Sequence, residues 1–172
     1  MKKQIILLST TLLLCLLISA CYSFRGISIN PNANTFYVAP FEVEVRGQEV
    51  PPPPTLSITF TERLKDKIRG ESRLNYKDVD PDIEFSGTIT GYDVTAEAPQ
   101  QGETTSFSRL TIRMSVEYID NKATEAEIQK KTVSFFQDYP TDQNLLSIQD
   151  DLIDDINDEL VDIIFNWAFN NW

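Results

Sequence analysis

The start of the chain constrains everything that follows, because it ends in Leu17-Ile18-Ser19-Ala20-Cys21. Two lysines precede an apolar run from Ile5 to Ile18, and two small residues stand directly before the cysteine. A basic start, a short apolar core and small residues at the cleavage point are typical of a secretory signal, and a cysteine directly after that point is typical of a lipobox. The sequence therefore predicts a lipoprotein signal peptide over residues 1–20, with the lipid on Cys21.

Two other interpretations of this start stay open, an ordinary secretory signal and an uncleaved membrane anchor. The anchor fits poorly, because the apolar run is 14 residues long and is broken by Ser9, Thr10 and Thr11, whereas a span needs about 20. A plain secretory signal would not need the cysteine. Residues 21–34 contain a glycine, a proline and three asparagines, so we expect a lipidated tether with little regular structure.

Composition excludes several classes of function. The chain has no histidine, and only two cysteines, of which Cys15 leaves with the signal. A Ser–His or Cys–His nucleophile cannot be built without these residues, and no glycine-rich phosphate loop follows a predicted strand. We therefore predict that the protein is not an enzyme and that it holds no metal and no cofactor.

The charge argues against nucleic acid as a partner. The formal net charge is −11, and removing the signal takes two lysines but no acid, which leaves 13 basic against 26 acidic residues. Binding to phosphate backbones needs clusters of Lys and Arg. Many of the acids follow residue 149, where a cation site is one interpretation; a solvated acidic face fits better, because no loop has the ligand spacing of a Ca²⁺ site.

Residues 35–172 are predicted to form one domain that contains both strands and helices. Period-2 and period-4 apolar patterns predict strands over 35–45, 82–96, 110–118 and 127–137 and helices over 55–69 and 144–169. Pro40 should force an edge position or a bulge in the first strand. Gly87 and Gly91 suggest bulges or close packing in the second, and Gly70 is expected as a left-handed cap. The four prolines at 51–54 are either a recognition motif or, as we favour, a stiff entry to the first helix.

This order, β-α-β-β-β-α behind a lipobox, resembles the LptE family of lipopolysaccharide-assembly lipoproteins. The residues that carry the resemblance are Tyr22-Ser23-Phe24, Phe60-Thr61-Glu62, Leu64-Lys65-Asp66-Lys67, Phe85-Ser86-Gly87, Ile89-Thr90-Gly91-Tyr92, Arg109-Leu110-Thr111-Ile112, Asp138-Tyr139-Pro140, Asn166-Trp167-Ala168-Phe169 and Asn171-Trp172. The resemblance implies an α+β fold, with a four-stranded, mostly antiparallel or mixed sheet and two helices packed on one face.

The resemblance also implies a function without catalysis. Members of this family sit at the outer membrane as a plug inside the LptD β-barrel, in a 1:1 complex. They help that barrel to assemble, bind lipopolysaccharide and assist its insertion into the outer leaflet. The expected protein is thus lipid-anchored on the periplasmic side and reaches into the barrel lumen. A generic lipid-anchored binding module of another envelope complex remains the alternative.

The strand around residue 112 suggests where lipopolysaccharide would bind. Leu110, Ile112 and Met114 alternate with polar residues, so one face of this strand is buried, and Arg109 and Arg113 point to the other. Lys130 reaches that same face if the third and fourth strands pair. Arg and Lys form charge-assisted hydrogen bonds to phosphate, so these three residues are the candidate lipopolysaccharide contact; ordinary solvent-facing residues are the alternative.

Overall fold

The computed structural model describes residues 29–48, 50–97, 106–123 and 127–170, so Cys21 and the expected signal peptide lie outside the described residues. Six strands and two helices make up this part, namely β1 (Thr35–Val38), β2 (Glu42–Val43), α2 (Leu56–Glu71), β3 (Asn75–Tyr76), β4 (Ile83–Glu97), β5 (Phe107–Asp120), β6 (Glu127–Pro140) and α3 (Leu145–Phe169).

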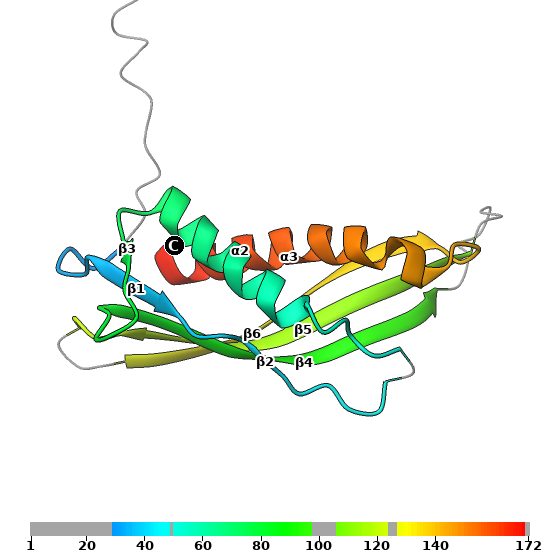
Figure 1. Ribbon diagram of the computed structural model, residues 1–172, viewed down its shortest axis with the longest axis horizontal. Coiled ribbons are helices and arrows are strands. Elements are labelled where there is room, and N and C mark those ends of the chain that lie inside the picture. Colours follow the sequence, from blue (N-terminus) through cyan, green and yellow to red (C-terminus); the bar gives the residue numbers. More distant parts are fainter. Residues whose placement is uncertain (1–28, 49, 98–105, 124–126, 171–172) are drawn as a thin grey trace, which may run out of the picture.

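The strands form one mixed sheet in the order β3-β1-β4-β5-β6, and β2 pairs with β4 beyond the end of β1. The long strands β4, β5 and β6 are antiparallel, whereas β1 and β2 run parallel to β4. Both helices lie on the same side of the sheet (Figure 1). The predicted α+β class, with a mixed sheet and two helices on one face, is confirmed, with six strands in place of four.

The first predicted strand, residues 35–45, is divided at Pro40 into β1 and β2. Proline lacks the N–H that a central ladder position needs. The Ala39 N–H still donates to the Phe85 carbonyl at 2.8 Å, and the Glu44 N–H resumes the pairing at the Ile89 carbonyl. The register shifts by one residue at this point, from Val38 opposite Phe85 to Glu42 opposite Thr88, so the bulge expected at Pro40 is present, and it removes the Phe41 backbone from the ladder.

Side chains of helix α2 form hydrogen bonds with the backbone groups of Phe41 that do not pair within the sheet. The Phe41 N–H donates to Thr61 Oγ1 at 3.1 Å, and the Ser57 hydroxyl donates to the Phe41 carbonyl. Both groups would otherwise lose their hydrogen bonds on burial, at a cost of about 1–3 kcal/mol each. The pair Ser57 and Thr61, one turn apart, thereby fixes the start of α2 above the strand break.

The Phe41 ring is buried against the sheet where Gly87 leaves room. Its ring packs edge to face on Phe60 of α2, with centroids 4.8 Å apart. A Cβ atom added at Gly87 would overlap the Phe41 ring and lie 2.6 Å from the Ser115 carbonyl. Gly87 therefore serves close packing, whereas Gly91 follows the bulge, where the register of β4 on β5 shifts.

The core lies between the helices and the sheet, as the apolar periodicity predicts. Apolar residues of the predicted helices and of β5 are buried there: Leu64, Leu110, Ile112, Leu152, Ile156 and Leu160. Helix α3 is buried over a wide arc, because Ile153, Asn157 and Val161 are buried as well. The buried arc is wide because α3 packs against α2 as well as against the strands.

The predicted left-handed cap at Gly70 is wrong. Helix α2 continues through Gly70 to Glu71, and Gly70 does not have a positive φ. Ser72 ends the helix instead, because its N–H and its hydroxyl both donate to the Ile68 carbonyl, at 3.0 and 2.6 Å. The Ser72 Oγ then accepts the Leu74 N–H at 3.1 Å, so a serine side chain replaces the turn that a glycine would make.

Candidate functional site

The candidate site is the outer face, by which we mean the side of β4, β5 and β6 that is turned away from the helices. Pairing of β5 with β6 places Arg109 opposite Asp138 and Glu117 opposite Lys130. Directly opposed residues share a face, so Lys130 lies on the same side as Arg109 and Arg113. The neighbouring Lys131 points to the helix side, where its Nζ lies 5.7 Å from the centre of the Trp167 ring.

Arg109 is held on this face by a bidentate ion pair with Asp138. Its Nε and Nη2 donate to the two carboxylate oxygens at 2.7 and 2.9 Å, and the guanidinium carbon lies 3.8 Å from the centre of the Phe136 ring. Glu97 is a second carboxylate neighbour at 3.7 Å. The hydrogen bond from Arg109 lowers the pKa of the Asp138 carboxyl below its usual value, so the pair is ionised at neutral pH.

The other two cations also have carboxylate partners. Arg113 Nη2 lies 3.4 Å from Asp93 Oδ2, and its side chain crosses β4 at Gly91, where an added Cβ would lie 2.7 Å from Arg113 Nη1. Lys130 pairs with Glu117, which stands directly opposite. Lys130 is the most exposed of the three cations, with 62% of its side-chain surface accessible.

On the outer face, each of these cations is therefore paired with a carboxylate of a neighbouring strand. Arg109 and Glu117, the cross-strand partner of Lys130, are eight residues apart on β5, or about 27 Å at 3.4 Å per residue. An anionic group can bind each cation by replacing or sharing its carboxylate. The sequence could show which way these residues point, but it could not show the carboxylates opposite them, because cross-strand partners depend on the register.

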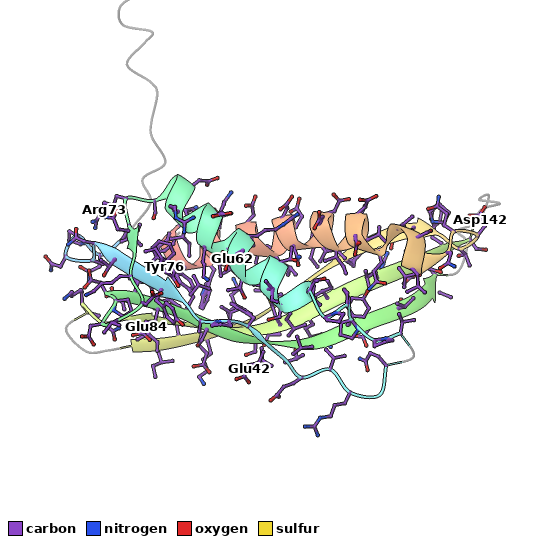
Figure 2. The ribbon with its side chains drawn as sticks, in the orientation of Figure 1. Glu42, Glu62, Arg73, Tyr76, Glu84 and Asp142 are labelled. Carbon is purple, nitrogen blue, oxygen red and sulfur yellow. The ribbon has the colours of Figure 1, made fainter. Side chains whose placement is uncertain are left out.

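Between the cations, the outer face is polar and slightly hollow. A depression of about 270 Å³ opens at the β1–β2 break, lined by Ala39, Pro40, Glu42, Ser86, Gly87, Thr88, Ser115 and Glu117. Glu42 projects from the side of the sheet opposite the helices (Figure 2). Hydroxyl and carboxylate groups of this kind can hydrogen-bond a polar headgroup, and they offer little apolar surface to an acyl chain.

Two further features of the described residues bear on function. Within residues 29–48, 50–97, 106–123 and 127–170, no group of three or more Cys, Asp or Glu side chains is placed to hold a metal ion. In the same part of the chain, neither helix is both long and apolar enough to cross a membrane.

The last residues of the expected tether are fixed to the domain. Arg73 donates to the carbonyls of Asn30 and Ala33 at 2.7 and 2.6 Å, and Ala33 is fully buried. The Asp82 carboxylate accepts the N–H groups of Asn34 and Thr35 at 2.8 and 3.0 Å. Any lipid attached upstream would thus reach the domain at the end where β4 begins.

Comparison with known proteins gives one family and a set of shared folds. The model of the LptE family, described as lipopolysaccharide-assembly, matches residues 33–166. No curated protein matches the chain in sequence.

Among solved structures, a hypothetical protein from Chlamydia trachomatis superposes with a TM-score of 0.54 at 9% identity, covering 81% of this chain and 99% of its own. A protein of the DUF330 family from Xanthomonas campestris gives 0.51 at 9% identity, with 82% and 89% covered. A putative neuraminyllactose-binding hemagglutinin homolog from Helicobacter pylori gives 0.51 at 9% identity, with 84% and 88% covered. At such identities these likenesses show the fold alone.

The contacts of Asp82 predict how the tether end responds to acid. The Asn34 N–H, with Lys122 and Thr35, lowers the pKa of Asp82 to about 2, against a usual value of about 3.9. Because this carboxyl has a lower pKa in the folded state than in the unfolded state, it stabilises the fold at pH values above its unfolded pKa. This stability is lost as the pH falls from about 4 to about 2. Urea unfolding should show Asp82→Asn less stable than wild type by about 1–2 kcal/mol at pH 7.

The difference between wild type and Asp82→Asn should shrink as the pH falls toward 2.5. Asp151→Asn is the matched control, since Asp151 is an exposed carboxylate of α3, and it should change stability by less than about 0.5 kcal/mol at either pH. A difference between wild type and Asp82→Asn that stays constant from pH 7 to pH 2.5 would contradict the assignment.

Proposed function

The chain belongs to the LptE family of lipopolysaccharide-assembly proteins, and on that premise we propose that it partners an LptD-type outer-membrane β-barrel as a plug and assembly factor. The observation that carries the proposal is the extent of the family match. Residues 33–166 include all six strands, α2 and all but the last residues of α3. The match thus covers the whole domain and not a single motif.

The anchor in this proposal is lipid on Cys21, which holds the domain at the periplasmic side of the outer membrane. The described domain starts at Ile29, so seven residues separate it from Cys21, and at full extension they reach about 25 Å. The docking of Asn30 and Ala33 by Arg73 fixes the far end of this tether. A short tether attached at one end of the domain limits how the domain can meet a barrel in the same membrane.

Lipopolysaccharide would contact this domain on the outer face, through Arg109, Arg113 and Lys130. All three side chains are partly or largely exposed, at 31%, 47% and 62% of their surface. Their carboxylate partners keep them extended over the sheet without removing them from water, so that a phosphate can take over part of the hydrogen bonding. If phosphate exchanges with these carboxylates, the affinity for lipopolysaccharide should depend strongly on ionic strength.

Purification of the tagged full chain from outer membranes in mild detergent tests the barrel role. We expect one large barrel protein in a 1:1 ratio. Recovery of a different envelope complex and no barrel would instead support the generic binding module. In the same cells, a fatty-acid probe should label the wild-type chain and not Cys21→Ala, and labelling of the alanine variant would contradict the anchor.

Binding of purified lipopolysaccharide to the double variant Arg109→Glu, Arg113→Glu tests the outer face. Affinity should fall at least about tenfold at low salt, because a charge-assisted hydrogen bond contributes on the order of 1.5 kcal/mol. Arg46→Glu, Arg69→Glu is the control with the same change in net charge, and both of these arginines lie outside β5 and β6.

Circular dichroism should first establish that both double variants are folded. Equal affinity of the two doubles would remove Arg109 and Arg113 from the binding surface, while leaving the barrel role untouched.

A further inference from the structure

Strand β6 ends the sheet and leaves one edge without a strand partner among the described residues. The Thr141 N–H donates to the Ser106 carbonyl, which fixes the hydrogen-bonding pattern of the β5–β6 ladder. In an antiparallel ladder, hydrogen-bonded and non-hydrogen-bonded pairs alternate along the strands. Odd-numbered residues of β6 therefore bond to β5. The N–H and C=O groups that point away from β5 belong to the even-numbered residues: Ile128, Lys130, Thr132, Ser134, Phe136 and Asp138.

The two edges of the sheet differ in how they are protected against strand pairing. On the other edge, β3 and β2 have only two residues each, and the chain between β1 and β2 is bulged at Pro40. Short edge strands, prolines and bulges all hinder the addition of a strand. Strand β6 is 14 residues long, and in this described strand the register on β5 is continuous from Glu127 to Pro140. The β6 edge is therefore the one that suits another strand.

Side chains along the β6 edge are exposed on both sides of the sheet. On the outer face, Ile128 and Phe136 are 56% and 44% exposed. On the helix side, Gln129 and Lys131 are also exposed, so α3 does not cover that part of the strand. A strand added to β6 would thus bury apolar surface and also form hydrogen bonds with the backbone groups of the edge.

We propose that β6 pairs with one extended loop segment of the barrel partner, which folds into the lumen and adds a strand to this sheet. The inference rests on the proposed function and agrees with a 1:1 complex, because each plug offers one such edge to one barrel. The strands of a closed barrel have no unpaired edge, so the barrel wall presents side chains to the plug. The loops of outer-membrane barrels are long, and some plug the lumen, so a loop segment is the part of the barrel that can supply backbone donors and acceptors.

The side chains of the edge define the sequence that such a segment should have. Lys130 and Lys131 lie near the start of β6, and Asp138 follows Lys130 by eight residues. Opposite charges on directly opposed residues stabilise a strand pair, and like charges destabilise it. The segment should therefore carry a carboxylate opposite Lys130 and a lysine or arginine opposite Asp138, with apolar side chains opposite Ile128 and Phe136.

The charge pairs already present in the sheet support this pattern. Glu117 stands opposite Lys130, and Arg109 stands opposite Asp138. A carboxylate beyond Lys130 and a cation beyond Asp138 would continue both rows across a third strand with alternating sign. The added segment would thus extend the cross-strand pairs of the outer face without leaving two like charges opposed.

Cross-linking in intact cells tests the proposal on the full chain, co-expressed with its barrel. A benzophenone amino acid in place of Thr132, whose side chain is exposed at this edge, should link the chain to the barrel protein on illumination. Mass spectrometry should then place the linked peptide in one barrel loop. The same amino acid in place of Ile58, which is 66% exposed on α2, is the control for exposure and should not link to that loop.

A second variant blocks the added strand without touching the bonds between β5 and β6. The Ser134 N–H faces the free edge, so Ser134→Pro deletes one donor and hinders strand addition. Ser134→Thr is the matched control, because threonine keeps the N–H. On native gels, the complex of Ser134→Pro should separate into chain and barrel at a lower temperature than the complexes of wild type and Ser134→Thr. Circular dichroism should first establish that both variants are folded.

A peptide linked from Thr132 that comes from a barrel strand, from a second copy of this chain or from no protein at all would overturn the inference. Equal separation temperatures for Ser134→Pro and Ser134→Thr would do the same. Each of these results leaves the barrel role in place, because the barrel is still recovered with the tagged chain. Failure of the proposed function gives a different result, purification of wild type without any barrel, and it would overturn this inference as well.

Discussion

The arrangement of this domain depends on the point where Pro40 interrupts the sheet. At Pro40 the register of the strand on β4 shifts by one residue, and the next residue, Phe41, turns its ring into the core over Gly87. Thr61 and Ser57 of α2 then take over the two backbone hydrogen bonds of Phe41. One interrupted strand thus positions the first helix, and the burial of one aromatic ring fastens that helix to β4.

The position of helix α3 depends on the position of α2, because ion pairs join the two helices. Arg63 reaches Asp154 at 2.8 Å, and Lys67 reaches Asp162 at 2.6 Å, so the two helices are bridged along their solvent side. Exposed ion pairs of this kind contribute about 0–1 kcal/mol each, and the buried apolar residues between the helices and the sheet stabilise the layer. The bridges have another effect, because they neutralise part of the acidic helix on the side facing α2.

The distribution of charge separates the two sides of the molecule. The exposed acids Asp151, Asp155 and Glu159 lie on α3, so much of the net charge of −11 belongs to the helix side. On the outer face, cations and carboxylates are interleaved, as the pairs of Arg109 and Arg113 show. A strongly acidic protein can therefore present a sheet face that carries exposed cations.

The sequence predicts the faces of the strands well and their partners poorly. The alternation of Leu110, Ile112 and Met114 sets which side is buried, because the side-chain period of a strand is two. It cannot give the register, so the Arg109–Asp138 pair across β5 and β6 could not be foreseen. Strand β3 escaped prediction because it has two residues, Asn75 and Tyr76, and is defined only by its pairing with β1.

Two glycine substitutions compared in one urea titration test the dependence on Phe41 most directly. Gly87→Ala should destabilise the fold by about 1–3 kcal/mol, since the added methyl group would overlap the Phe41 ring and press on the Ser115 carbonyl. Gly70→Ala is the matched control inside α2, with no atom within 4 Å of the added Cβ, and it should stabilise by about 0.5–1 kcal/mol. Equal stability of the two variants would contradict the account.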